Sequence, residues 1–184
     1  SWFKRMAEWM AMFLPIALPF YLVRFSIAGL PSTLLEMYLG IFLMVFTIAY
    51  RWSGWKMSWE RMSGWRYLVI AWLVTTLLAA FVSPSLWTGL GLWRAYILEP
   101  ILVFALLFVV AQEENVRRKM MQAMFAVVWG VVIWAVVQFA TGKGIPHPWN
   151  VSIAAGRRAT GPYPFPNALA LFVTPIAALA FVEW

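Results

Sequence analysis

The feature that most constrains this chain is a series of six apolar runs separated by short connections. The runs span Trp9–Val23, Leu34–Tyr50, Tyr67–Val82, Tyr96–Ala111, Met120–Ala140 and Ala168–Trp184. Crossing a bilayer takes roughly 20 helical residues, and flanking Trp, Tyr and Arg can extend a shorter run. A β-barrel would need alternating polar residues, whereas Ile101–Val110 is continuously apolar. The sequence therefore predicts an all-α, polytopic membrane protein with about six transmembrane helices.

The composition excludes several classes of protein. Only 11% of the 184 residues are charged and 64% are hydrophobic, whereas a soluble domain carries about 25% charged residues. The chain has no cysteine, one histidine and no cluster of His, Asp and Glu, so we predict neither a metal nor another cofactor. The net charge of +7 is spread in short clusters between apolar runs. This pattern predicts a lipid bilayer, not a nucleic acid, as the partner.

The basic residues also predict orientation. If six helices alternate, nine basic residues share the N-terminal side: Lys4, Arg5, Arg51, Lys56, Arg61, Arg66, Arg117, Arg118 and Lys119. The other side holds five: Arg24, Arg94, Lys143, Arg157 and Arg158. The excess of Lys and Arg places the N-terminus in the cytoplasm. Three of the five outer charges lie in one loop, Thr141–Pro166, and this cluster indicates an anionic partner at the outer surface.

The stretch Gly156–Asn167 is the strongest candidate site. Gly161 permits a tight turn, Pro166 ends a proline-rich segment, and Asn167 is suited to cap the next helix. Arg157 and Arg158 would then lie on a rigid loop beside a helix start, where guanidinium groups and backbone N–H groups together favour phosphate. This arrangement predicts a pyrophosphate clamp. The alternative is that both arginines bind lipid headgroups and anchor the helix.

Three stretches resemble the O-antigen ligase and O-antigen polymerase family. They are Arg158-Ala159-Thr160-Gly161 followed by Pro166–Ala170, then Leu18–Phe25 followed by Gly29–Glu36, and finally Gly91–Pro100. The resemblance implies a bacterial inner-membrane enzyme of lipopolysaccharide and cell-envelope biosynthesis. Such enzymes move a glycan from undecaprenyl pyrophosphate to an acceptor at the periplasmic face. The arginine of the family signature, thought to engage the pyrophosphate, corresponds to Arg158.

Two departures from the family bear on this expectation. The signature often has histidine before its Pro-Asn pair, and here Phe165 stands there. The family's catalytic histidine and another arginine lie in a later, large periplasmic loop. We therefore expect residues 1–184, a single transmembrane helical domain, to be the N-terminal part of a longer protein. The identity of the glycan and acceptor, ligation versus polymerisation, and the oligomeric state stay open.

Other ionisable residues are candidates with plainer alternatives. Glu99 lies inside an apolar run, where it could activate an acceptor or pair with Arg94. Arg24 and Glu36 flank the first outer turn and are expected to pair in the same way. His147 could act as a general base, but it stands between two prolines as an ordinary surface residue would.

The competing function is a transporter or a helical subunit of a complex, without catalysis. In that case the basic outer loop would bind anionic lipid or a protein partner. The Trp-rich second connection, which includes Trp55, Trp59 and Trp65, predicts a short interfacial helix or hairpin on the inner leaflet.

Overall fold

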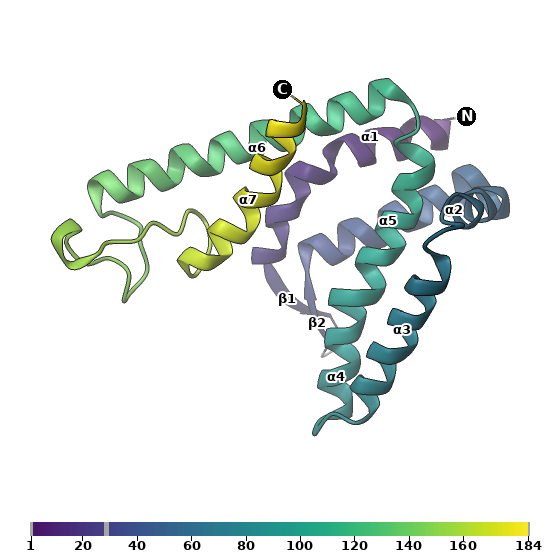
Figure 1. The fold of residues 1–184 in the computed structure, drawn as a ribbon, viewed down its shortest axis with the longest axis horizontal. Coiled ribbons are helices and arrows are strands. Elements are labelled where there is room, and N and C mark those ends of the chain that lie inside the picture. Colours follow the sequence, from purple (N-terminus) through teal and green to yellow (C-terminus); the bar gives the residue numbers. More distant parts are fainter. Residues whose placement is uncertain (1, 28–29, 184) are drawn as a thin grey trace. The chain divides into compact units, whose positions relative to one another are not determined.

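The computed structural model describes residues 2–27 and 30–183 (Figure 1). Contacts along the chain group into two units, Ser1–Lys119 and Met120–Trp184, which we describe separately. The first unit contains α1 (Trp2–Ala17), the 3-10 helix η1 (Leu18–Leu22), β1 (Arg24–Ile27), β2 (Leu30–Thr33), α2 (Leu34–Arg61), α3 (Arg66–Phe81), α4 (Leu86–Trp93), the π-helix η2 (Arg94–Leu98) and α5 (Glu99–Val110). Helix α6 (Glu114–Thr141) begins in it; most of α6, the short η3 (Ile153–Ala155) and α7 (Pro166–Glu183) form the second.

Three helices in the described residues are long and apolar enough to cross a membrane: Leu34–Arg61, Leu86–Val110 and Glu114–Thr141. The second is the continuous run of α4, η2 and α5, and it starts ten residues before the apolar run that begins at Tyr96. Only 17–22% of the apolar windows of these helices are buried. Their hydrophobic side chains therefore face outward, as a helix in lipid requires and a helix in water does not. The predicted helical membrane architecture is confirmed at this level.

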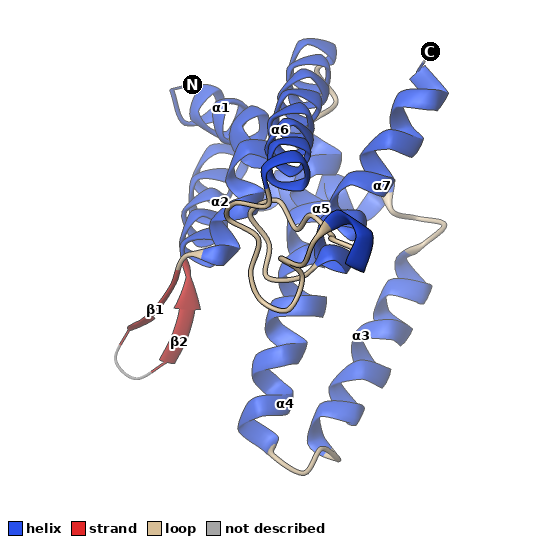
Figure 2. Ribbon diagram, turned by 90° about the vertical axis from the view of Figure 1, so that its left-hand side faces the viewer, coloured by secondary structure: helices blue, strands red, loops and turns tan. Residues whose placement is uncertain are grey.

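The first apolar run departs from a simple crossing helix. α1 ends at Ala17, and the chain continues as η1, which carries Pro19 at one of its first two positions. Proline has no N–H to donate and clashes with the preceding turn, which accounts for the end of the α-helix. β1 and β2 then pair antiparallel, with Arg24 opposite Thr33 (Figure 2). Our all-α prediction missed this small hairpin, whose strands satisfy each other's backbone groups.

Helix α2 packs between α1 and α5 in the first unit (Figure 1). Small residues of α1, Ala7 and Ala11, are fully buried and allow close approach of the helices. Phe42 and Phe46 of α2 and Leu106 of α5 are also fully buried. The core of this unit is thus a thin seam along α2, with the outer faces of the helices left apolar.

Arg94 holds two helix starts together. Its Nη2 lies 3.1 Å from Oε2 of Glu36 at the start of α2, and its Nε lies 3.2 Å from Oε1 of Glu99 at the start of α5. The predicted pairing of Arg94 with Glu99 is confirmed. The predicted pairing of Arg24 with Glu36 is wrong, because Glu36 turns to Arg94 and also caps its own helix by accepting from the Thr33 N–H.

The π-helix explains how the chain continues through Pro100. Within η2 the backbone N–H of Glu99 donates to the carbonyl of Arg94, five residues earlier. A π-turn of this kind adds a residue and relieves the clash that a proline causes in the preceding turn. The same turn brings Arg94 and Glu99 within contact distance. The π-turn therefore both accommodates Pro100 and allows the ion pair between Arg94 and Glu99.

Removing the Arg94 cation should destabilise the first unit. Arg94→Met leaves two partly buried carboxylates close together without their shared cation. Because the Arg94 side chain is 43% exposed, we expect a cost of about 1–3 kcal/mol, below that of breaking a fully buried pair. The midpoint of thermal unfolding in detergent should fall, and Arg94→Met combined with Glu36→Gln and Glu99→Gln should recover part of the loss. Arg24→Met, at an exposed arginine, is the control. Equal losses for Arg94→Met and Arg24→Met would contradict this role.

Candidate anion-binding loop

The candidate site lies in the second unit, in the loop of residues 142–165 between α6 and α7. The loop contains the single turn η3, whose first N–H groups are capped by Ser152: its side chain accepts from the Ala155 N–H at 3.2 Å. Gly156 ends the turn with a left-handed backbone, φ 87°. Arg157 and Arg158 follow directly, so a structured turn fixes the point at which both side chains leave the backbone.

Gln138, in the last turns of α6, ties the loop to the helix. Its side chain is almost fully buried. Nε2 donates to the carbonyls of Gly144 and Gly161 at 2.8 and 2.9 Å, while Oε1 accepts from the N–H groups of Thr160 and Gly161 at 3.2 and 2.8 Å. One amide side chain therefore satisfies buried backbone groups at both ends of the loop. Because unsatisfied buried N–H groups are costly, this residue fixes the path of the loop.

Arg157 has a structural role in the same loop. Its Nε donates to the carbonyl of Val151 and its Nη1 to the carbonyl of Phe139, both at 2.9 Å. The guanidinium lies against Gly142, where a Cβ would meet Nη2 at 2.8 Å; Gly142 also has a positive φ of 71°. Glycine at 142 thus leaves room for the Arg157 side chain, which closes the loop onto the end of α6.

Arg158 is exposed and contacts an aromatic ring of the same loop. Its guanidinium carbon lies 5.3 Å from the centre of the Trp149 ring, and its backbone N–H donates to the Trp149 carbonyl at 3.3 Å. A cation held over an aromatic face keeps its N–H groups free at the edge of the guanidinium plane. Arg158 is therefore held in place without the carbonyl hydrogen bonds that engage Arg157.

The loop returns to α7 through Gly161. This residue has a φ of 59°, and a Cβ there would lie 3.2 Å from Cδ1 of Leu169 in the first turn of α7. Helix α7 begins at Pro166, a residue well suited to a first helical position because its missing N–H would have no partner there. The structure therefore places Asn167 inside the first turn, and our expectation that Asn167 caps the helix is not met.

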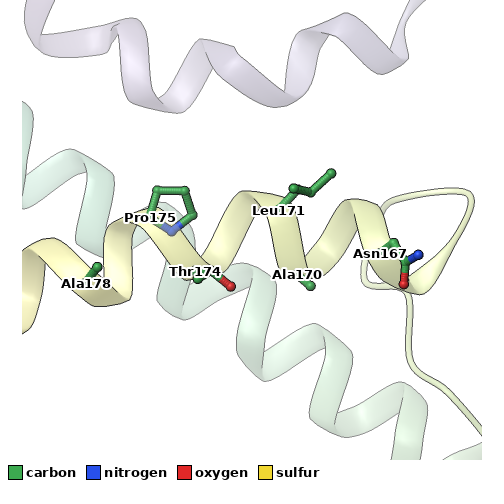
Figure 3. Close-up of a pocket in the computed structure, with 6 residues that line it drawn as sticks. All are labelled: Asn167, Ala170, Leu171, Thr174, Pro175 and Ala178. Carbon is green, nitrogen blue, oxygen red and sulfur yellow. The ribbon is translucent and has the colours of Figure 1, made fainter.

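An open hollow of about 530 Å³ runs along one face of α7. Its lining comes from this helix alone: Asn167, Ala170, Leu171, Thr174, Pro175 and Ala178 (Figure 3). Figure 3 shows these residues following one another along the ribbon, with Asn167 at the loop end. The hollow is mostly apolar, with Asn167 and Thr174 as the polar residues of its lining.

The remaining candidates lie apart from this arrangement. His147 is exposed in the loop, within two residues of Trp149. Glu99 belongs to the first unit, where it pairs with Arg94. Within the described residues, no group of three or more His, Cys, Asp or Glu side chains could hold a metal ion. The loop offers exposed cations and an aromatic ring, a set suited to an anion.

The sequence analysis did not identify Gln138 and Trp149 as site residues, although Gln138 fixes the loop and Trp149 stacks against Arg158. Gln122 and Gln138 are the two amides in the apolar run Met120–Ala140, and a polar residue such as Gln138, close to the end of a membrane helix, needs partners. That signal could have flagged it. The stacking of Trp149 under Arg158 depends on the loop path and had no sequence signature.

Comparison of the chain with models of protein families, with curated proteins and with solved structures finds no match.

Gln138→Leu should loosen the loop. Leucine leaves the buried N–H groups of Thr160 and Gly161 without an acceptor, at about 1–3 kcal/mol each. We expect hydrogen exchange at these two amides to accelerate by at least tenfold, with the helices unchanged. Gln138→Glu is the matched control: its carboxylate still accepts both N–H groups but loses the two donated bonds, so its effect should be intermediate. Unchanged exchange in Gln138→Leu would show that Gln138 does not hold the loop.

Proposed function

We propose that this chain belongs to the lipid-linked glycan transferases and acts on a glycan carried by undecaprenyl pyrophosphate, passing it to an acceptor at the outer face of a bacterial inner membrane. In this proposal Arg158 binds the pyrophosphate and stabilises it as the leaving group. The observation that carries the proposal is an exposed arginine, stacked on Trp149, on a loop whose backbone is fixed from within by Gln138.

Three features support a pyrophosphate as the ligand. Arg158 keeps its planar fork of donors free, and such a fork matches phosphate oxygens. Gly161 follows Arg158 by three residues and lies beside the first turn of α7. The start of a helix favours anions. The hollow along α7 begins at Asn167 and offers apolar surface to a lipid chain (Figure 3).

Arg157 has a different role in this proposal from the one that the sequence predicted. The sequence suggested that both arginines clamp the ligand, whereas two of the Arg157 nitrogens donate to loop carbonyls. Arg157 therefore supports the loop and lends long-range positive charge. The transition state would gain about 3–4 kcal/mol from a well-placed donor such as Arg158. The proposal assigns this donor end of the reaction and assigns no general base.

The membrane placement is part of the proposal. Six crossings, with the N-terminus in the cytoplasm and the loop of residues 142–165 outside, would use the three long apolar helices together with α1 and η1, α3 and α7. Within the first unit, Lys4 lies 5.3 Å from the centre of the Tyr50 ring, next to Arg51. Two of the basic clusters assigned to the inner side thus meet, which favours that orientation.

A second candidate is a non-catalytic membrane protein, a transporter or a complex subunit. The exposure of Arg158 and Lys143 favours it, because exposed cations at a membrane surface also attract anionic headgroups. The two functions differ in selectivity: a headgroup anchor needs only charge, whereas a donor site prefers pyrophosphate.

Binding of undecaprenyl pyrophosphate to the purified chain in nanodiscs tests the proposal. We expect saturable binding that prefers undecaprenyl pyrophosphate to undecaprenyl monophosphate and to phosphatidylglycerol. Arg158→Ala should weaken it about tenfold or more, since it removes charge-assisted hydrogen bonds. Arg158→Lys should recover only part of the affinity, because an ammonium lacks the bidentate fork.

Lys143→Ala is the matched control, since Lys143 is an exposed cation of the same loop. It should leave binding nearly unchanged if the site is built around Arg158. Equal losses for Lys143→Ala and Arg158→Ala, together with equal binding of all anionic lipids, would reject the donor site and leave a headgroup-binding loop.

A further inference from the structure

A second functional surface lies in the first unit, on the segment Trp52–Arg66, which we call the ledge. Helix α2 is interrupted at Arg51, whose φ of 53° and ψ of −154° are not helical. The helix then resumes and ends at Arg61. The apolar run Leu34–Tyr50 lies before this break, so the ledge leaves the direction of the long apolar helix. The ledge begins where the sequence changes from apolar residues to a mixture of Trp and basic residues.

The inner face of the ledge is fixed to the rest of the unit. Gly54 is buried at the bend, where a Cβ would lie 2.4 Å from Cβ of Tyr50. The buried hydroxyl of Ser58 donates to the Ala105 carbonyl at 2.6 Å, and Nη1 of Arg61 donates to the Phe108 carbonyl at 3.2 Å. These contacts attach the ledge to the C-terminal end of α5. The ledge is therefore a packed part of the fold of this unit.

The outer face of the ledge combines aromatic rings with positive charge. Trp52 is 80% exposed, Trp59 43% and Trp65 67%. Lys56 lies between Trp52 and Trp59 in sequence and forms only a long, exposed contact of 3.8 Å with Glu60. With Arg51 included, the segment holds four basic residues and one acidic residue. Neither a soluble surface nor a packed core accounts for three exposed tryptophans beside cations.

Further cations lie at the same end of the unit. Lys4 of α1 contacts the Tyr50 ring beside the bend, and Lys119 at the start of α6 lies 5.7 Å from the centre of the Trp9 ring. Arg61 binds the last turn of α5, and α6 begins four residues after α5 ends. Cations of α1 and α6 therefore lie at this end of the unit, together with the carboxylates of Glu8 and Glu113, which lie close enough to Tyr50 to interact with it.

We infer that the ledge is a binding surface for anionic phospholipid headgroups. Trp rings are amphipathic and prefer the depth of the headgroups, while Lys and Arg beside them attract acidic lipids. The break at Arg51 places this face at the end of the apolar stretch Leu34–Tyr50, the level at which headgroups lie when such a stretch enters a bilayer. A protein partner would have to cover the same cationic face, and it is the alternative that the experiment separates. This inference does not rest on the proposed transferase activity.

Two single substitutions of one ion pair give the test. Lys56→Gln and Glu60→Gln both break the same exposed contact, so a purely structural role of the pair predicts the same change in both. Headgroup attraction predicts opposite changes, because one variant removes a positive charge and the other a negative one. The measurement is native mass spectrometry of the full chain in detergent, with phosphatidylglycerol and phosphatidylcholine added in equal amounts.

We expect the wild-type chain to retain phosphatidylglycerol in preference to phosphatidylcholine. Lys56→Gln should lower this preference by up to about fivefold, the scale of one charge near a membrane surface, and Glu60→Gln should raise it. Changes of the same sign, or no change in either variant while thermal unfolding stays as in wild type, would overturn the inference.

Discussion

The fold depends on the need of every backbone and side-chain polar group to find a partner inside the protein where the solvent is lipid. Charged residues are too few to cover a water-facing surface, and most of the apolar helix faces are exposed. Polar groups along these helices are therefore engaged: Arg94 by two carboxylates, Ser58 by a carbonyl and Gln138 by four backbone groups. Each of these contacts also fixes a local feature of the fold: Arg94 the π-turn, Ser58 the ledge and Gln138 the loop of residues 142–165.

The same requirement gives the two surfaces their different character. In the loop of residues 142–165, the amide of Gln138 and the guanidinium of Arg157 make the internal hydrogen bonds. The guanidinium of Arg158 stacks on the Trp149 ring instead, which leaves its N–H groups available to a ligand. On the ledge, the inner face is satisfied by α5 and the cations remain scattered among exposed tryptophans. A single oriented arginine suits a defined phosphate group, whereas scattered charges suit a layer of headgroups. This difference separates a candidate donor site from a membrane contact.

Much of the helical architecture could be predicted because apolar runs and their flanking charges are local signals. The runs Leu34–Tyr50 and Met120–Ala140 lie within α2 and α6 as expected. The hairpin of β1 and β2 was missed because its strands are four residues each and carry no alternating pattern. The start of α4 was missed because the apolar run was taken to begin after Arg94, at Tyr96, whereas in the fold Arg94 lies within a continuous helix and pairs with Glu99 across a π-turn. The role of Arg157 could not be predicted, since one of its acceptors lies 18 residues away.

The crossing pattern that we propose puts the loop of residues 142–165 and the ledge on opposite sides of the membrane. The chain has no cysteine, so single cysteines can be placed at exposed lysines of each surface and labelled with a membrane-impermeant maleimide in intact cells. We predict that Lys143→Cys is labelled in intact cells and that Lys56→Cys is labelled only after permeabilisation. Labelling of both from one side would contradict the crossing pattern, and the reverse pattern would place Arg158 in the cytoplasm, away from an outer-face transfer reaction.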